Sequence, residues 1–355
     1  MSSMRIDDID TPAPVVDLDR VERNLKRAAD YFSEKKIALR PHIKTHKVVE
    51  FARRQVELGA VGITCQKLGE AEVMADGGIT DILMTFPIVG EAKLKRLMAL
   101  AKGIRMSAVT DSTEVADAMA RVASDAGVRI ELLVECDTGT GRCGVQNADE
   151  AVALAERIAN TRGVAFGGLM VYPEKGKVAR TRAWIAEALA ALKRSGLEAK
   201  TVSVGGTPDM YQAHELEFST EHRPGTYIYS DRAITAAGVG TLDDTALRVV
   251  ATVVSRPTAD RAIIDAGSKT LTSDLLGFPD HGVILEYPKA RIVRLNEEHG
   301  IVDLSDSPEK PRIGERVTIV PNHACVVSNL FDSIYGVSDG RVLREIPVAA
   351  RGLVR

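Results

Sequence analysis

Short apolar segments alternate with longer amphipathic segments over the first two thirds of the chain. The apolar segments are rich in β-branched residues and lack a polar face, which is typical of strands buried in a parallel sheet. Eight such segments are expected to be strands: residues 36–44, 61–66, 81–86, 105–110, 130–136, 165–172, 201–206 and 226–231. Helical periodicity marks residues 69–76, 91–101, 112–126, 148–159 and 181–195 between them. This order predicts a closed parallel (β/α)8 barrel of the TIM type; a doubly wound open sheet has a similar rhythm, but the count of eight favours the barrel.

After about residue 240 the pattern changes to short strands separated by turn residues. The segments LRVVATVVS, RAIIDAG, KARIVRLN and RVTIVPNHAC predict a compact antiparallel β domain. The first residues, before a helix expected to begin near Leu18, are assigned to the same domain. The predicted organisation is therefore a barrel domain at residues 18–240 and a β domain formed by residues 1–17 and 241–355.

Composition narrows the possible partners and the compartment. The 355 residues carry a formal net charge of -3 without a basic run, which argues against binding to nucleic acid or to an anionic membrane surface. No apolar stretch is long enough to span a bilayer, and the acidic N-terminus lacks an apolar signal core, so the expected location is the cytoplasm. Four widely spaced cysteines do not indicate a disulfide framework. They are Cys65, Cys136, Cys143 and Cys325, of which the first three are expected to be small buried side chains.

A lysine ends the first predicted strand. The segment IALRPHIKTHK places Lys44 at the C-terminal mouth of the barrel, where barrel enzymes build their sites. An amine in a packed mouth is desolvated, which favours the neutral, nucleophilic form that makes a Schiff base. A solvated lysine is the alternative, and for Lys44 taken alone it is the commoner case. The choice depends on what the other strand ends carry.

Anion-binding residue types follow the later strands. Arg142 lies in the Gly-rich loop of DTGTGRCGV after the fifth strand, where its planar guanidinium can hold a phenolate or a carboxylate, and Tyr172 ends the sixth strand. Glycines that let backbone N–H groups approach a phosphate, and threonines that add hydroxyl donors, follow the seventh strand and lie at the eighth. These residues are Gly205, Gly206, Thr207, Gly225, Thr226 and Tyr227. Each motif alone also fits an ordinary turn, but their order round one mouth favours a phosphate site.

With these motifs in place, the sequence resembles the fold-type III pyridoxal 5'-phosphate (PLP) enzymes, which have the alanine racemase fold. Within that group it is most similar to the D-threonine aldolase and D-serine dehydratase branch. The resemblance runs from TPAPVVDLDRVERN through PHIKTHK, DTGTGRCGV, GGTP, RPGTYIYSD and DAGSKTLTSD to PNHAC. It implies that Lys44 is the Schiff-base lysine, that Arg142 lies near O3' of the cofactor, and that Tyr172 lies at its ring. It assigns the remaining cofactor contacts to Gln66, Gly206, Thr207, Gly225, Thr226 and Tyr227.

The segment PNHAC adds a candidate metal site. In an extended strand, residues two apart point the same way, so His323 and Cys325 are expected on one face. An imidazole and a thiolate make half of a site for a divalent ion such as Zn²⁺, although from the residues alone two core or surface side chains are the usual interpretation. The resemblance implies a metal here, with Zn²⁺, Mn²⁺ and Mg²⁺ as candidates. Two protein ligands leave the shell open to water and substrate, as in catalytic sites.

The resemblance implies a lyase that uses PLP and a divalent metal to act on small β-hydroxy-D-amino acids. D-threonine aldolase activity, which gives glycine and an aldehyde, is the main prediction, and dehydration of D-serine or D-threo-3-hydroxyaspartate is the alternative. An amino acid racemase has no use for a metal pair, and non-catalytic PLP-binding proteins are typically barrel only. Many relatives carry a histidine-containing segment after the tyrosine, whereas here Tyr172 is followed by PEKG, so Glu174 is the candidate base. The resemblance also implies a homodimer.

Overall fold

The structure, a computed structural model, describes residues 4–355. The chain packs as two compact units, and α1 (Leu18–Lys35) contributes residues to both. The barrel unit consists of Ala28–Lys44, Val49–Gly225 and Leu353–Arg355. The β unit consists of the N-terminal residues up to Arg27 together with Thr45–Val48 and Thr226–Gly352. Among the described residues, no helix is both long and apolar enough to cross a membrane.

The barrel unit contains one parallel sheet of eight strands. In chain order they are β2 (Ala38–Leu39), β3 (Ile63–Cys65), β4 (Asp81–Met84), β5 (Arg105–Thr110), β6 (Ile130–Cys136), β7 (Val164–Val171), β8 (Thr201–Val204) and β9 (Glu221–His222). They are hydrogen-bonded in the order β2-β9-β8-β7-β6-β5-β4-β3. The two end strands also meet, because the N–H of Val61 donates to the Leu39 carbonyl at 2.9 Å and His42 forms a parallel bridge with Thr64. The sheet therefore curls round on itself, and the predicted barrel fold is confirmed.

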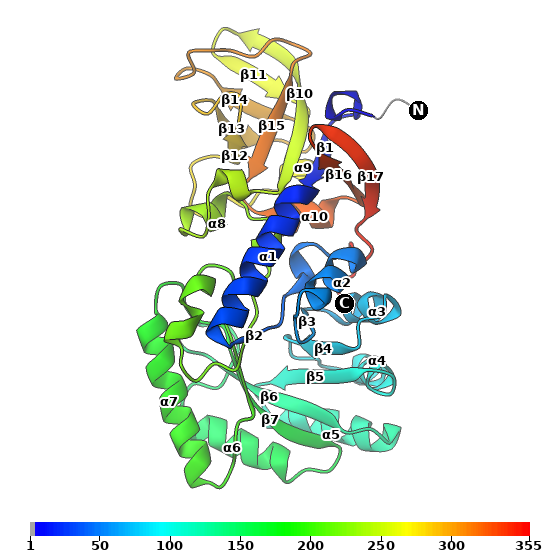
Figure 1. The fold of residues 1–355 in the computed structure, drawn as a ribbon, viewed down its shortest axis with the longest axis vertical. Coiled ribbons are helices and arrows are strands. Elements are labelled where there is room, and N and C mark those ends of the chain that lie inside the picture. Colours follow the sequence, from blue (N-terminus) through cyan, green and yellow to red (C-terminus); the bar gives the residue numbers. More distant parts are fainter. Residues whose placement is uncertain (1–3) are drawn as a thin grey trace. The chain divides into compact units, whose positions relative to one another are not determined.

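Amphipathic helices cover the outside of these strands, as Figure 1 shows for α4 to α7 beside β5, β6 and β7. The helices are α2 (Val49–Glu57), α3 (Leu68–Asp76), α4 (Glu91–Ala101), α5 (Thr113–Ala126), α6 (Ala148–Ala159) and α7 (Val178–Arg194), with the 3-10 helix η3 (Met210–Glu215). Their ends follow from local sequence: the Ser112 hydroxyl caps α5, and Gly127 ends it at a φ of 68°. Apolar side chains from four neighbouring strands cluster together; they are Leu83, Val109, Leu133 and Met170.

The β unit contains a nine-stranded sheet in the order β11-β14-β13-β12-β15-β10-β1-β16-β17. Its strands are β1 (Ala13–Asp17), β10 (Leu247–Thr258), β11 (Arg261–Ile264), β12 (Gly282–Ile284), β13 (Arg291–Leu295), β14 (Gly300–Asp303), β15 (Arg316–Pro321), β16 (Ser333–Ser338) and β17 (Arg341–Pro347). A further pairing of β10 with β11 closes the β10 to β15 part into a small barrel. Its shorter elements are α8 (Arg232–Ala236), α9 (Ser268–Leu271), α10 (Ala324–Leu330), η1 (Ile6–Asp8) and η5 (Leu242–Asp244). The predicted antiparallel β domain is thus confirmed.

The prediction for the eighth barrel strand is wrong. Residues 226–231 begin with the 3-10 helix η4 (Thr226–Ile228), and the eighth strand is β9, which lies earlier in the chain. Pro224 explains the early end of β9, because it has no N–H to donate to a neighbouring strand and it restricts the residue before it. Its carbonyl still accepts the His42 N–H at 2.9 Å. Gly225 and Thr226 therefore follow the strand instead of lying within it.

The first predicted strand is too long. Only Ala38–Leu39 of residues 36–44 forms a strand, and Lys44 lies in the 3-10 helix η2 (Ile43–Thr45). Pro41 interrupts the strand because it cannot donate to the ladder. Lys44 is therefore presented by a short helical turn after the strand.

The extended geometry expected for PNHAC is also wrong. Strand β15 ends at Pro321, His323 is the N-cap of α10, and Cys325 lies in the first turn of that helix. Because residues two apart on a helix do not share a face, their proximity needs a cap residue with a non-helical backbone. His323 provides it, with φ -138° and ψ 102°.

Candidate active site

A histidine links Lys44 to Gln66 in the barrel unit. The backbone N–H of Lys44 donates to Nδ1 of His42 at 3.3 Å, and Nε2 of His42 lies 2.9 Å from Oε1 of Gln66. Because Nδ1 of His42 accepts this hydrogen bond, the proton of the neutral imidazole lies on Nε2 and points at Oε1 of Gln66. The hydroxyl oxygen of Thr85 also lies near Nε2 of His42, at 3.3 Å. The half-buried Lys44 thus sits in a fixed turn, and His42 is a site residue that the sequence did not identify.

Arg142 and Tyr172 come together from two loops of the barrel unit. The Arg142 guanidinium lies 4.8 Å from the centroid of the Tyr172 ring. Asp137 shapes the loop before Arg142 by accepting the N–H groups of Gly139 and Thr140, both at 2.8 Å. Burial would raise the pKa of Asp137, but these hydrogen bonds lower it overall. Arg142 and Tyr172 therefore form one surface, and the ionised Asp137 holds the loop that precedes Arg142.

The Gly-rich loop after β8 packs against both Tyr172 and a buried histidine. A Cβ on Gly206 would lie 3.0 Å from the Tyr172 ring, and one on Gly205 would lie 1.9 Å from Cε1 of His222. Burial lowers the pKa of His222 to about 4, so the ring is neutral, and its Nε2 donates to the Gly206 carbonyl at 3.0 Å. The hydroxyl of Thr207 accepts the N–H of Gly225 at 3.1 Å, which ties this loop to the one after β9.

Two backbone donors of this loop remain available. Among the hydrogen bonds of residues 4–355, none is donated by the backbone N–H of Gly206 or Thr207. Free N–H groups on a Gly-rich loop at the C-terminal end of a barrel strand are suited to hold a phosphate. The two N–H groups are compatible with the phosphate site that the sequence predicts, which stays a prediction.

Two buried charged residues near Arg142 were not predicted. The Glu135 side chain is 4% exposed, its Oε1 lies 3.8 Å from Nη2 of Arg142, and its Oε2 has no hydrogen-bond partner among the described residues. Burial, opposed by Arg142, raises the pKa of Glu135 to about 7. Arg223 donates to Oγ of Ser203 at 2.7 Å and to the Val171 carbonyl at 2.9 Å, and burial lowers the pKa of Arg223 to about 10. A proton on Glu135 is therefore gained or lost near neutral pH.

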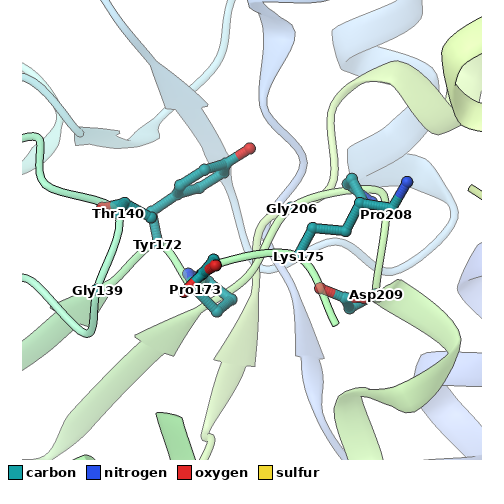
Figure 2. Close-up of a pocket in the computed structure, with 9 residues that line it drawn as sticks. Gly139, Thr140, Tyr172, Pro173, Lys175, Gly206, Pro208 and Asp209 are labelled. Atoms are coloured by element: carbon teal, nitrogen blue, oxygen red, sulfur yellow. The ribbon is translucent and has the colours of Figure 1, made fainter. Parts of the chain in front are cut away.

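Glu174 lines a cavity of about 330 Å³ in the barrel unit. Figure 2 shows Thr140 and Tyr172 on one side of it and Lys175 and Asp209 on the other. The Glu174 carboxylate is 41% exposed and lies 3.6 Å from Arg180. The candidate base thus shares a cavity with Tyr172 and carries a cationic neighbour.

In the β unit, the side chains of His323 and Cys325 lie close enough to interact. Nδ1 of His323 lies 2.8 Å from Oδ2 of Asp274. Burial would lower the pKa of His323, but the Cys325 sulfur and the Asp274 carboxylate raise it to about 9. The surroundings of this imidazole thus favour a positive charge.

Two hydroxyls lie against the sulfur. Oγ1 of Thr45 is 3.2 Å and Oγ1 of Thr226 is 3.6 Å from Sγ of Cys325. Thr226, predicted as a phosphate contact, therefore has its hydroxyl beside the candidate metal ligand, while Tyr227 in η4 is buried. Hydroxyl donors stabilise a thiolate, which is the form of cysteine that binds metals.

The residues described above can be compared with what PLP and a divalent metal each need from a protein. PLP needs an amine, phosphate donors and a partner for its phenolate, which Lys44, the free N–H groups of Gly206 and Thr207, and the 51% exposed Arg142 offer. A borderline-soft divalent ion needs imidazole and thiolate donors in an environment that favours cations, as at His323 and Cys325. Within residues 4–355, no group of three or more His, Cys, Asp or Glu is placed to hold a metal, so this pair would supply two ligands and leave positions open. The residues fit both groups.

Known families and known proteins match nearly the whole chain. The alanine racemase N-terminal domain family matches residues 16–233, and the putative serine dehydratase domain family matches residues 246–337. D-threonine aldolase of Arthrobacter sp is 36% identical over 363 residues, which cover 98% of this chain and 94% of that protein. D-threo-3-hydroxyaspartate dehydratase of Delftia sp. (strain HT23) is 33% identical over 367 residues, covering 94% and 96%.

Solved structures agree with these matches. The crystal structure of D-threonine aldolase from Filomicrobium marinum has a TM-score of 0.93 at 36% identity and covers 99% of each chain. A cysteine-to-alanine mutant of D-threo-3-hydroxyaspartate dehydratase in the metal-free form has a TM-score of 0.87 at 30% identity, covering 97% of this chain and 98% of that one. The chain therefore belongs to the family of alanine racemase-fold lyases that contains the D-threonine aldolases and the D-threo-3-hydroxyaspartate dehydratases.

Proposed function

We propose that this chain is a PLP- and divalent-metal-dependent lyase that cleaves β-hydroxy-D-amino acids, of the D-threonine aldolase type. The similarity to D-threonine aldolases over nearly the whole chain supports the reaction class. The observation that carries the proposal is the placement of His323 at the N-cap of α10, where it pairs with Asp274, and of Cys325 in the first turn of the same helix. A racemase has no use for such a pair.

Residues of the barrel unit would hold the cofactor. PLP, when bound, stabilises negative charge at Cα of the amino acid joined to it. Lys44 supplies the amine that attaches it, and the N–H groups of Gly206 and Thr207 receive its phosphate. Arg142 offers its guanidinium to the phenolate oxygen, and the position of the guanidinium over the Tyr172 ring fixes the orientation of its N–H groups.

Residues of the β unit would hold the metal. His323 and Cys325 donate a nitrogen and a sulfur, and the bound ion supplies Lewis acidity at the β-oxygen of the substrate. The position of the proton acceptor then decides the outcome. Removal of the β-hydroxyl proton by Glu174 leads to cleavage between Cα and Cβ, whereas removal of the Cα proton by Lys44 leads to loss of water.

Dehydration is the second candidate, and one observation favours it. The predicted ligand pair includes the cysteine sulfur of Cys325, and a related dehydratase carrying a cysteine-to-alanine change is described in the metal-free form. A thiolate ligand is thus compatible with elimination from D-serine or D-threo-3-hydroxyaspartate.

A product assay distinguishes the two candidates. The purified protein is incubated with D-threonine, and separately with D-serine, in the presence of PLP and either Mn²⁺ or Zn²⁺. The proposal predicts glycine and an aldehyde from D-threonine. A 2-oxo acid and ammonia in place of glycine would assign the chain to the dehydratases, and racemised substrate alone would reject both lyase candidates.

We also propose that the chain is a cytoplasmic homodimer, with residues 18–240 as its cofactor-binding part and residues 1–17 and 241–355 as its metal-binding part. Symmetric dimers are the commonest oligomers, and the resemblance to fold-type III enzymes points the same way. Light scattering at assay concentration should give twice the 38.2 kDa chain mass. A fully active monomer would reject the dimer.

A further inference from the structure

The imidazole of His323 has two ring nitrogens with different tasks. Nδ1 lies 2.8 Å from Oδ2 of Asp274, a residue of the loop that follows α9. An ionised carboxylate only accepts hydrogen bonds, so when the ring is neutral, as a metal ligand must be, its proton lies on Nδ1 and Nε2 keeps its lone pair. The contact is partly shielded, with the His323 side chain 28% exposed and that of Asp274 39% exposed. Asp274 therefore selects the tautomer in which Nε2 can bind a metal.

The main chain on both sides of His323 is anchored. The side-chain amide of Asn322 donates to the Asp274 carbonyl at 3.2 Å, so consecutive residues both hold Asp274. On the other side, Oδ2 of Asp231 accepts the N–H of Ala324 at 3.0 Å. Asn322 and Asp231 are each 1% exposed. The partly exposed pairing of His323 with Asp274 is thus held by hydrogen bonds from two buried residues, unlike a chance ion pair at the surface.

We propose that Asp274 is a positioning residue of the metal site, which holds His323 so that Nε2 can bind a divalent ion together with Sγ of Cys325. The inference rests on the proposed function, because it takes His323 and Cys325 as the metal ligands. A carboxylate behind a metal-bound histidine fixes the ring and makes its free nitrogen a better donor. Asp274 itself is not a ligand, since its carboxylate engages the nitrogen on the other side of the ring.

The test measures metal binding directly. The PLP-loaded protein competes for Mn²⁺, and separately for Zn²⁺, with a chromophoric chelator. Wild type should bind one ion per chain, and His323→Ala should lose this binding. Asp274→Ala should weaken the affinity about 10- to 100-fold. Asp274→Asn keeps an acceptor but not the charge, so its loss should be smaller.

Asp306→Asn is the matched control. It makes the same chemical change at a carboxylate of the β unit that is 70% exposed and lies 3.6 Å from Arg291, and its affinity should equal that of wild type. Equal affinities of wild type and Asp274→Ala, with binding lost in His323→Ala, would overturn the inference and leave the proposed function intact. Absence of binding by wild type would instead reject the metal site itself.

A folding defect in Asp274→Ala is recognised by a Tm well below that of Asp306→Asn. In that case Asp274→Asn decides, because it preserves the shape of the side chain. An affinity below that of Asp306→Asn supports the inference, and an affinity equal to it refutes the inference.

Discussion

Replacing Gly205 with alanine should destabilise the barrel unit and weaken the binding of PLP. Gly205 has a φ of +99°, and a Cβ there would lie 1.9 Å from Cε1 of His222. The histidine ring has little room to move, because it is buried, is stacked on Phe32 with centroids 5.3 Å apart, and donates to the Gly206 carbonyl. Any shift of the ring therefore also moves Gly206, whose N–H is a proposed phosphate donor.

Two costs add to give the magnitude. An L-residue in the left-handed region costs about 1–2 kcal/mol, and forcing a methyl group into filled space costs about 1–3 kcal/mol. The free energy of unfolding should therefore fall by about 2–5 kcal/mol. In a unit of this size each kcal/mol lowers Tm by about 2–4 °C, so a fall of at least about 4 °C is expected.

Gly176→Ala separates the two costs. Gly176 also has a positive φ, +72°, but a Cβ there would meet nothing within 4 Å. It should show only the backbone cost and keep the PLP affinity of wild type. Thermal and urea unfolding of both variants, with a PLP titration, make the comparison. A Gly205→Ala protein as stable as Gly176→Ala would refute the described packing of His222 against the loop.

Three further changes test separate parts of the site. Lys44→Ala should lose the yellow adduct that borohydride fixes to the protein; the same fixed adduct with normal turnover would show that another residue binds PLP. Because burial raises the pKa of Glu135 from its ordinary 4.5 to about 7, the folded state binds this proton more tightly than the unfolded state. The stability of wild type relative to Glu135→Gln should therefore be greatest below pH 4.5 and fall as the pH rises through 7, as measured by urea unfolding, and a pH-independent difference would contradict this pKa. Cys325→Asp keeps an anionic ligand but makes it hard, so activity with Mn²⁺ or Mg²⁺ should rise relative to activity with Zn²⁺, and an unchanged ratio would argue against Cys325 as a ligand.

The sequence predicted the central strands of the barrel well and its first and last strands poorly. Strands such as β5 and β6 are six and seven residues long, are mostly apolar and have turn residues at both ends, so their bounds are visible locally. β2 and β9 are two residues long, and each is followed within two positions by a proline that ends the ladder. Such short strands are defined by their pairing partners, which no local pattern reveals.

Motifs located the residues that offer donors to a ligand, because glycine, arginine and lysine at strand ends have a chemical signature. Residues that hold these donors in place were not predicted, and the reason is physical. Nothing in the local sequence distinguishes the buried Glu135 from a surface glutamate, or links His42 to Gln66. Asp274 is 49 positions from His323, so only the fold brings them together. His323 and Cys325 were predicted to be close in a strand, and the structure brings them together at a helix cap instead.

Exhaustive chelation shows whether turnover depends on a bound metal. The protein is treated with a chelator and assayed on D-threonine, while the absorption band of bound PLP is recorded in the same sample. We expect that turnover is lost and that added Mn²⁺ or Zn²⁺ restores it. The PLP band should persist, because the metal ligands and the PLP-binding residues are different side chains. Full activity of the metal-free protein on a β-hydroxy-D-amino acid would show that no metal is needed, and would reject both the metal-dependent aldolase and the metal-dependent dehydratase candidates.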